Sequence, residues 1–333
     1  MTQDQFNMPS LFSGDRSIFE LDESIAESIG HRSYVCDEGN IKDITYVNNN
    51  FFVAVENNDK IQIFKSNNLD NWKMIGNYSF EDLSNAKFFV GDVSLILMAE
   101  RTWHYNFYFS NDYKNFKKFS IDTDQRFDGQ IGDFVSVVHT DKKFYIVSEE
   151  GIHEKYILSG SDLLNMKIVF SITPDSGLKC WSRSNIAFCN NKLYTVIEKD
   201  FESMLLVLDE NMNTTYPKAN ISSFVNLVPL NNKIYISDDA DIRVFDTKIN
   251  KIIDKFSNQF GDLEKIRVFN NQTFAILPDD DGLHFTKNMK DWKTISADIS
   301  DDIRFAYGND ILIIYGMGDE TENYLDYFKL TDL

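Results

Sequence analysis

The residues of this chain whose types could do chemistry are a few carboxylates and guanidinium groups on short alternating segments. Asp43, Asp133, Arg183 and Arg304 fall on segments with the two-residue period of a strand. Glycoside hydrolysis needs two carboxyl groups about 5 to 10 Å apart across the sugar. An arginine such as Arg183 could instead clamp a substrate carboxylate. If the chain is an enzyme, Asp43, Asp133 and Arg183 are the predicted catalytic residues.

The composition favours a function without catalysis. The chain has 52 acidic and 33 basic residues and a net charge of −19, so carboxylates occur along its whole length. Carboxylates that line a solvated channel need have no chemical role, and a fold does not by itself imply an activity. We therefore expect a non-enzymatic protein and keep the glycan-active enzyme as the alternative.

Motifs for cofactors and metals are absent from the sequence. The five histidines form no HExxH pattern and no Cys/His cluster, and no phosphate-binding glycine loop or nucleophile elbow is present. The run Asp279–Gly282 resembles a calcium loop only briefly and is better explained as a solvated turn. We expect no cofactor and no metal.

Three aromatic residues are candidates for stacking on a glycan. Trp103, Tyr113 and Trp181 fall on predicted loops or strand starts. Aromatic rings in so aromatic a chain usually belong to the core, and this alternative stays open.

The elements that would position these residues repeat along the chain. The stretch from Lys60 to Tyr78 reads as a strand, a polar corner ending in Trp72, and a second strand. Similar corners recur roughly every 40 to 50 residues, a period typical of propeller blades. The corners are 66–72, 110–116, 160–166, 209–215, 246–252, 286–292 and, shortened, 329–333.

A second series of turns lies about twenty residues before each corner. These turns are rich in Asn, Asp and Gly, which tolerate the positive φ angles of tight hairpins. They are 48–50, 91–92, 141–142, 190–191, 231–232, 270–271 and 309–310. Each unit therefore carries four antiparallel strands in a meander.

These units predict an all-β fold, a seven-bladed β-propeller with four-stranded antiparallel blades. The last unit lacks its outer strand, and the segment Arg32–Cys36 stands where an outer strand would be. Pairing this N-terminal strand with the last blade would close the fold and remove two exposed edges. Six blades are the alternative.

The domain prediction is an N-terminal extension, residues 1–30, followed by the propeller, residues 31–333. The segment Asp22–Gly30 is predicted to be a short helix, and it must pack on the propeller or on a partner. The apolar residues Phe6, Met8, Leu11 and Phe12 are the predicted partner-binding residues of an arm.

Charge and hydropathy limit partners and location. A net charge of −19 repels phosphate backbones, so we expect no nucleic-acid partner. No signal peptide and no transmembrane segment are recognisable, so no membrane partner is expected, and the predicted location is a virion or the cytoplasm.

The corners SNNLDNW, SNDYKNF and TKNMKDW resemble degenerate forms of the Asp-box of sialidase-like propellers, and also the SxDLxxW corner of five-bladed glycoside hydrolases. The resemblance implies a β-propeller architecture and no activity, because the box is a folding device remote from the active site. Asn68 and Asn288 stand where the box has Asp. The arginine triad, the Tyr-Glu nucleophile pair and the acidic trio of those enzymes are not recognisable. Similar propellers occur in phage tail and fibre proteins.

Three functions remain open at this point. The first is a non-enzymatic interaction or structural module, a phage virion propeller associated with the tail or fibre, which binds a protein or a glycan. The second is a glycoside hydrolase or sialidase-like glycan-active enzyme. The third is a cytoplasmic scaffold propeller. For the first, the expected partners are other virion subunits, bound through the N-terminal arm, and a glycan.

Overall fold

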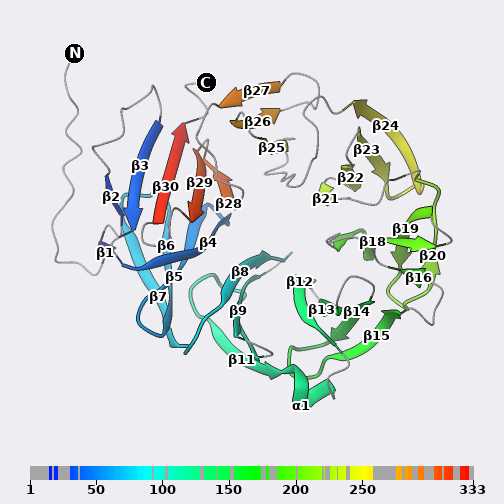
Figure 1. The fold of residues 1–333 in the computed structure, drawn as a ribbon, viewed down its shortest axis with the longest axis horizontal. Coiled ribbons are helices and arrows are strands. Elements are labelled where there is room, and N and C mark those ends of the chain that lie inside the picture. Colours follow the sequence, from blue (N-terminus) through cyan, green and yellow to red (C-terminus); the bar gives the residue numbers. More distant parts are fainter. Residues whose placement is uncertain are drawn as a thin grey trace. The chain divides into compact units, whose positions relative to one another are not determined.

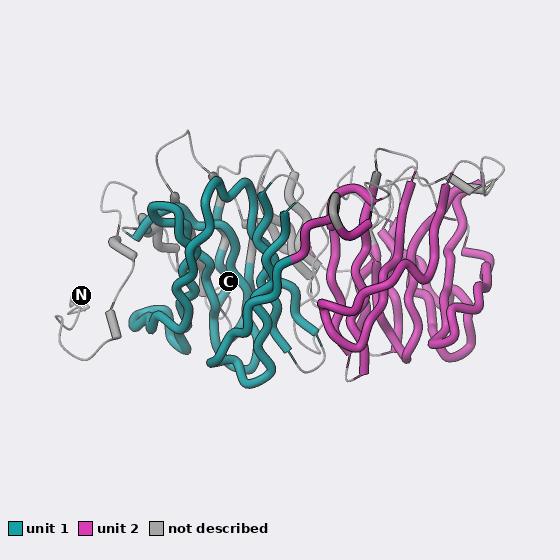
Figure 2. Tube along the Cα trace, turned by 90° about the horizontal axis from the view of Figure 1, so that it is seen from below, with its two compact units in different colours: residues 1–120, 300–333 teal, residues 121–299 magenta. Residues whose placement is uncertain are grey.

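The structure is a computed structural model, and it describes most of the chain. The described residues are 15–16, 19–21, 31–36, 38–91, 94–101, 104–127, 131–140, 142–150, 154–173, 178–179, 186–199, 202–219, 221, 226–230, 232–237, 241–257, 275–279, 282–286, 292–295, 304–309, 311–317 and 323–329. The chain divides into two compact units (Figure 2), unit 1 with residues 1–120 and 300–333 and unit 2 with residues 121–299. The strands of the described residues form seven antiparallel sheets, numbered here in chain order (Figure 1).

Unit 1 contains sheets 1, 2 and 7. Sheet 1 has the order β1-β7-β6-β5-β4, sheet 2 the order β11-β10-β9-β8, and sheet 7 the order β2-β3-β30-β29-β28. The strands are β1 Asp15–Arg16, β2 Phe19–Leu21, β3 His31–Cys36, β4 Asn40–Val47, β5 Asn50–Glu56, β6 Lys60–Ser66, β7 Trp72–Ser79, β8 Asn85–Val90, β9 Leu95–Arg101, β10 His104–Ser110, β11 Lys117–Asp122, β28 Arg304–Gly308, β29 Ile311–Met317 and β30 Asn323–Lys329.

Unit 2 contains sheets 3 to 6 and the short helix α1, Thr123–Phe127. Sheets 3 and 5 are four-stranded meanders, sheet 6 has three described strands, and sheet 4 is built on β18 and β19 with short strands beside them. The strands are β12 Asp133–His139, β13 Phe144–Glu150, β14 Glu154–Gly160, β15 Lys167–Ile172, β16 Leu178–Lys179, β17 Ala187–Cys189, β18 Lys192–Lys199, β19 Glu202–Leu208, β20 Thr214–Thr215, β21 Asn226–Leu230, β22 Lys233–Ser237, β23 Asp241–Asp246, β24 Lys251–Ser257, β25 Ala275–Asp279, β26 Gly282–Thr286 and β27 Trp292–Ile295.

The N-terminal strand completes the last sheet, as the sequence predicts. β3 pairs antiparallel with β30, with His31 opposite Phe328 and Val35 opposite Tyr324 (Figure 1). Sheet 7 thereby gains the outer strand that its own stretch of sequence lacks. The pairing leaves neither β3 nor β30 as a strand with an open side, since β2 pairs with β3 on its other side.

Two further strands come from the predicted N-terminal extension. β1 pairs with β7 of sheet 1, and β2 pairs with β3 of sheet 7. Parts of residues 1–30 therefore belong to the sheets of unit 1. The predicted helix Asp22–Gly30 and the arm residues Phe6, Met8, Leu11 and Phe12 lie outside the described residues.

The five corners between residues 66 and 252 fold as the sequence predicts, and their own side chains hold them, whereas the corners at 286–292 and 329–333 lie mostly outside the described residues. In the first corner the hydroxyl of Ser66 accepts from the Leu69 N–H at 3.0 Å, and the Asn68 side-chain oxygen accepts from the Asp70 N–H at 3.2 Å. The Trp72 indole N–H donates to the Leu69 carbonyl at 2.7 Å. In the second corner Asp112 Oδ1 accepts from the backbone N–H of the second and third following residues. Asp162 and Asp246 accept in the same way, and Asp209 accepts from the N–H groups of the second and fourth following residues.

The tight hairpins have the backbone that their Asn residues favour. Asn48 and Asn49 have φ angles of 50° and 57°, and Asn190 and Asn191 have 50° and 59°. Positive φ at both central residues is the requirement of the hairpin turn that matches the twist of two antiparallel strands. The predicted hairpin at 270–271 and most of the corner at 286–292 lie outside the described residues.

The cores lie between neighbouring sheets of each unit. In unit 1, Phe52 and Leu97 belong to a cluster between sheets 1 and 2, and Phe64 and Ile313 to a cluster between sheets 1 and 7. Unit 2 has comparable clusters between sheets 3 and 4, 4 and 5, and 5 and 6. Since both faces of a middle sheet pack on neighbours, its strands carry apolar residues on both faces.

Candidate functional site

Asp43, a predicted catalytic residue, lies on β4 and joins three sheets. It is buried, with 8% of its surface exposed. One carboxylate oxygen accepts from the Tyr315 hydroxyl of sheet 7 at 2.7 Å and from the Ile44 N–H at 3.0 Å. The other oxygen accepts from the Phe88 N–H of sheet 2 at 2.5 Å. The carboxylate therefore links sheets 7, 1 and 2 within unit 1.

The contacts of Asp43 suit a structural role. Three groups donate hydrogen bonds to the Asp43 carboxylate: the Tyr315 hydroxyl and the backbone N–H groups of Ile44 and Phe88. Burying a carboxylate is tolerated when such donors replace water. A general acid or nucleophile must instead face a substrate. The catalytic hypothesis for Asp43 stays a prediction, and the contacts argue for Asp43 as a joint between sheets.

Asp133, the second predicted carboxylate, begins β12 of unit 2 and is exposed. In the register of sheet 3 it stands opposite Glu149, and Glu149 stands opposite Lys155. Lys155 is fully buried, and its Nζ lies 2.7 Å from Glu149 Oε1. The buried ammonium is thus matched by a carboxylate of the neighbouring strand. Asp43 belongs to unit 1 and Asp133 to unit 2.

A glutamate recurs near the end of the second strand in the first three sheets. Neither the corners nor the hairpins of the sequence predict it. Glu56, Glu100 and Glu149 stand opposite the first residues of the first strands, Asn40, Asn85 and Asp133. In sheet 1 the partner is Lys42, whose Nζ lies 2.7 Å from Glu56 Oε2. The sequence does mark these glutamates, because each ends the largely apolar run of a strand, as in VAVE and IVSE.

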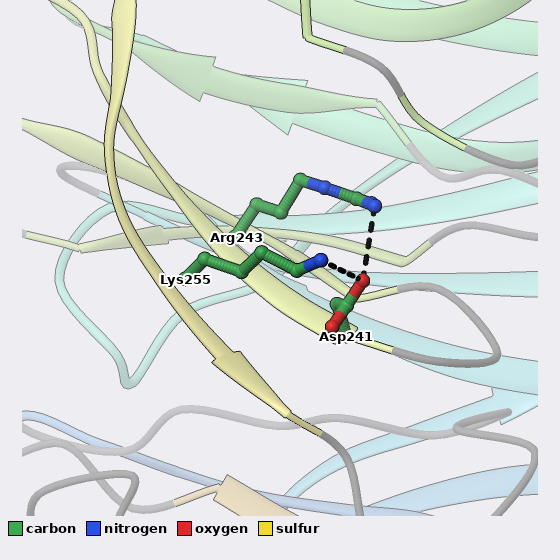
Figure 3. A network of polar contacts seen from close by, with 3 residues as sticks. All are labelled: Asp241, Arg243 and Lys255. Carbon is green, nitrogen blue, oxygen red and sulfur yellow. Dashed lines mark hydrogen bonds and ion pairs between the residues drawn. The ribbon is translucent and has the colours of Figure 1, made fainter.

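Sheet 5 carries a charged network on two neighbouring strands (Figure 3). Asp241 Oδ2 lies 3.1 Å from Arg243 Nη2 and 2.7 Å from Lys255 Nζ. Asp241 is buried, whereas the Lys255 side chain is 56% exposed. Desolvation by burial lowers the pKa of Arg243. One carboxylate therefore holds two cations, and one of the two faces solvent.

Tyr113, the described member of the three predicted stacking aromatics, packs on its own protein. Its backbone has a φ of 57°, its ring centroid lies 6.3 Å from that of Phe52, and it borders the core between sheets 1 and 2. Burial raises the pKa of Tyr113. The Lys65 ammonium donates to the Tyr113 carbonyl at 3.3 Å. Its use as a glycan platform stays a prediction.

The remaining predicted site residues cannot be placed. Trp103, Trp181 and Arg183 lie outside the described residues, and of Arg304 only the backbone, at the start of β28, is described. Within the described residues, no group of three or more His, Cys, Asp or Glu side chains gathers as metal ligands would. Across the same residues, no helix combines the length and the apolar character that crossing a membrane requires.

Most of the large apolar side chains that face solvent belong to unit 2. Of the eight such side chains among the described residues, two belong to unit 1 and six to unit 2. Those of unit 1 are Met74 and Val90, and those of unit 2 are Leu164, Ile168, Val169, Tyr216, Ile249 and Ile253. Five of the six lie on the outer strands β15 and β24 or on the corners that lead into them. The sequence does not predict that these residues are exposed, because the same aliphatic side chains occur in the core and on the surface of strands.

Solved structures with a similar fold define the class of the chain. Kluyveromyces lactis Hsv2 with its loop 6CD replaced has a TM-score of 0.55 at 13% identity, over 86% of this chain and 96% of that chain. The AfRom2 CNH domain has a TM-score of 0.51 at 10% identity, over 89% of this chain and 98% of that chain. No protein-family model and no curated protein matches the sequence.

The sheets and these neighbours make the chain an all-β protein of the β-propeller class, which confirms the predicted fold. Identities of 10 to 13% carry the fold and nothing finer. The resemblance to Asp-box propellers of the sialidase or phage type stays a prediction.

Proposed function

We propose that this propeller is a non-enzymatic interaction module that binds a partner protein through the outer strands of unit 2. The observation that carries the proposal is the group of exposed aliphatic side chains on β15 and β24 and their corners. Ile249 is 57% exposed and Leu164 51%. Each exposed aliphatic residue leaves apolar area in water. Removing that area from water contributes a transfer free energy of about 25 cal/mol per Å², before the costs of association are subtracted.

The charges beside these side chains indicate the kind of surface that would fit. Lys248, Lys251 and Lys255 are exposed near Ile249 and Ile253, in a chain whose net charge is −19. One exposed carboxylate, Asp254, lies among them, and Lys255 is already paired with Asp241. A partner surface with aliphatic side chains and carboxylates would complement this strip. Complementary charges of this kind set orientation and association rate more than affinity.

The finer parts of the proposal come from the sequence. The partner is a virion subunit of a phage tail or fibre, and the arm residues Phe6, Met8, Leu11 and Phe12 make a second contact with it. A glycan is the alternative ligand, with Trp103, Tyr113 and Trp181 as the stacking residues. These statements rest on the Asp-box resemblance and on composition.

Site-specific photo-crosslinking in the producing cells tests the main claim. A photoreactive residue at Ile249 or Leu164 should give a covalent adduct with one protein, identified by mass spectrometry, and the matched position Val90 in unit 1 should give none. Ile253→Asp should abolish the adduct at Ile249 without lowering the melting temperature of the isolated chain. Adducts at Val90 as frequent as at Ile249 and Leu164 would contradict the proposal.

The glycan-active alternative has its own test. Asp133→Asn should leave a glycan screen unchanged if the chain is an interaction module. Turnover by the wild-type chain that Asp133→Asn removes would establish the enzyme in its place.

A further inference from the structure

A lysine recurs at one position of the outer strands. In β7, β15 and β24 the ladder to the preceding strand skips one residue, namely Ile75, Val169 and Ile253. Two residues before each skipped residue stands an exposed lysine, Lys73, Lys167 or Lys251. The repeat thus places the same cation beside the outer edge of sheets 1, 3 and 5.

On sheet 1 this edge is already occupied by the chain itself. β1 pairs antiparallel with the start of β7, with Asp15 opposite Lys73 and Arg16 opposite Trp72. The pairing ends before Ile75, where the bulge interrupts the regular ladder. Residues of opposite charge that stand directly across two antiparallel strands stabilise the pair. β1 therefore shows what this edge accepts: a short extended segment, here with Asp15 in register with the lysine and Arg16 in register with Trp72.

Sheets 3 and 5 differ in how their own residues match the lysine. On sheet 5, Lys251 stands opposite Asp246 of the neighbouring strand, so a carboxylate is already across from it. On sheet 3, Lys167 stands opposite Ser159, which carries no charge. Of these two lysines, Lys167 is the one left without an acidic residue across the sheet.

The surroundings of Lys167 add a second cation and apolar contacts. The guanidinium of Arg126, which lies on α1, donates to the Leu164 carbonyl in the corner before β15. Leu164 is 51% exposed, Ile168 37% and Val169 36%. The outer edge of sheet 3 thus combines a lysine with an uncharged residue directly across from it, an arginine at the corner and three exposed aliphatic side chains.

We propose that the outer edge of β15 binds an extended acidic segment of a partner protein. The segment adds antiparallel to β15 as β1 adds to β7, with a carboxylate opposite Lys167. Its backbone pairs with the outer side of β15, where the described residues place no strand, and its apolar side chains cover Leu164 and Val169. This inference rests on the proposed function and names the binding mode and the chemistry of the partner.

The bulge at Val169 limits the added strand to a short stretch, so a single segment binds weakly. Its affinity falls as salt rises, because the lysine and the carboxylate face solvent. A partner that offers several such segments, or that also covers the strip on β24, gains affinity from multivalency.

A peptide that copies β1 is the direct probe. The peptide has the sequence of residues 11–20 of this chain, including Asp15. With the full chain and excess peptide, hydrogen exchange measured by mass spectrometry should slow in the segment 164–169 and stay unchanged in the segment 248–253. Lys167→Glu should weaken binding about fivefold, since it removes an attraction and adds a repulsion. Lys251→Glu, the matched control, should leave binding unchanged.

Three results would overturn the proposal. One is equal binding by a peptide in which Asp15 is replaced by Lys. Another is a loss of binding in Lys251→Glu as large as in Lys167→Glu. The third is slowed exchange confined to β7, which would mean that the peptide only replaces β1. If peptide binding fails while photo-crosslinking at Leu164 still gives a defined partner, the strand-addition mode is wrong and the proposed function stands.

Discussion

Units 1 and 2 are built from the same kind of sheet and use polar side chains differently. In unit 1, polar contacts run between sheets: Asp43 reaches both neighbours of sheet 1, and the Tyr46 hydroxyl donates to the Asn309 side chain of sheet 7 at 2.7 Å. In unit 2, the ion pairs Lys155–Glu149 and Lys255–Asp241 stay within one sheet, as the pair Lys42–Glu56 does in unit 1. Among the described residues of unit 2, polar side-chain contacts between sheets centre on Thr247, which accepts from Asn190 at 2.6 Å.

The outer strands of the sheets also differ between units 1 and 2. The N-terminal strands β1, β2 and β3 add to sheets 1 and 7 of unit 1, whereas the outer strands β15 and β24 of unit 2 expose aliphatic residues. The difference indicates a division of labour. Unit 1 uses its polar groups and its N-terminal strands to hold sheets together, whereas unit 2 exposes most of the large apolar side chains, the surface on which the proposed function depends.

The largest expected effect tests the within-sheet ion pair of unit 2. Lys155→Met should lower the free energy of unfolding by about 3 kcal/mol, because Glu149 is left partly buried without its cation. Urea denaturation measures the loss, and the double variant with Glu149→Gln should recover most of it. Hydrogen exchange should speed up in β13 and β14 and not in unit 1. Equal loosening of β4 and β5 would show that the two units do not behave separately.

The next effect tests the joint of unit 1. Asp43→Ala should cost about 2 to 3 kcal/mol, since the Phe88 N–H and the Tyr315 hydroxyl lose a buried acceptor. Asp133→Ala is the matched control at an exposed carboxylate and should change the free energy of unfolding by less than about 1 kcal/mol. A similar loss in both variants would remove the distinction between a buried joint and a solvated charge.

A smaller effect tests the contact of sheets 7 and 1. A Cβ at Gly308 would lie 2.2 Å from ring atoms of Tyr46, so Gly308→Ala should destabilise the chain by about 1 to 2 kcal/mol in urea denaturation. Tyr46→Ala in the same chain should remove most of this penalty because it opens the space. If the double variant is no better than the sum of the two single ones, the glycine acts through something other than this close approach.

The smallest effect concerns the corners, which both units share. Hydrogen bonds from Asn115 and Lys114 hold the pKa of Asp112 well below its usual range. Because the folded pKa is depressed, this stabilisation is complete above the unfolded value of about 4 and is lost as the pH falls through the folded value. Asn68→Asp should copy Asp112, raising the melting temperature by about 1 °C at pH 7 and less at pH 3. A gain that does not change with pH would mean that the charge of the new carboxylate plays no part.

Local features of the fold could be predicted because local chemistry decides them. The corner at Ser66 is held by its own hydroxyl and amide side chains, and the hairpin at Asn48 by residues that tolerate positive φ. Both signals lie within seven residues of sequence. The closing strand β3 followed from counting strands, because the last sheet lacked one.

The candidate site was harder to predict, because its residue types are ambiguous. The sequence marked Asp43 and Asp133 as equivalent carboxylates, and only the packing separates a buried joint from an exposed strand start. Lysines usually face solvent, yet Lys155, near the start of β14, is fully buried against Glu149. The exposed Ile249 and Ile253 carry the same side chain as Ile236 and Ile242, which are buried in the same sheet.

The sequence by itself determined the repeat, the strand and corner chemistry, the all-β class and the strand that closes the last sheet, because each of these depends on residues near one another or on a count of equal units. The tertiary structure decided which charges became joints, which aliphatic residues face solvent and which outer edges the N-terminal strands occupy. These outcomes depend on neighbours from distant parts of the chain, and no local pattern of residues records which neighbours a side chain will meet.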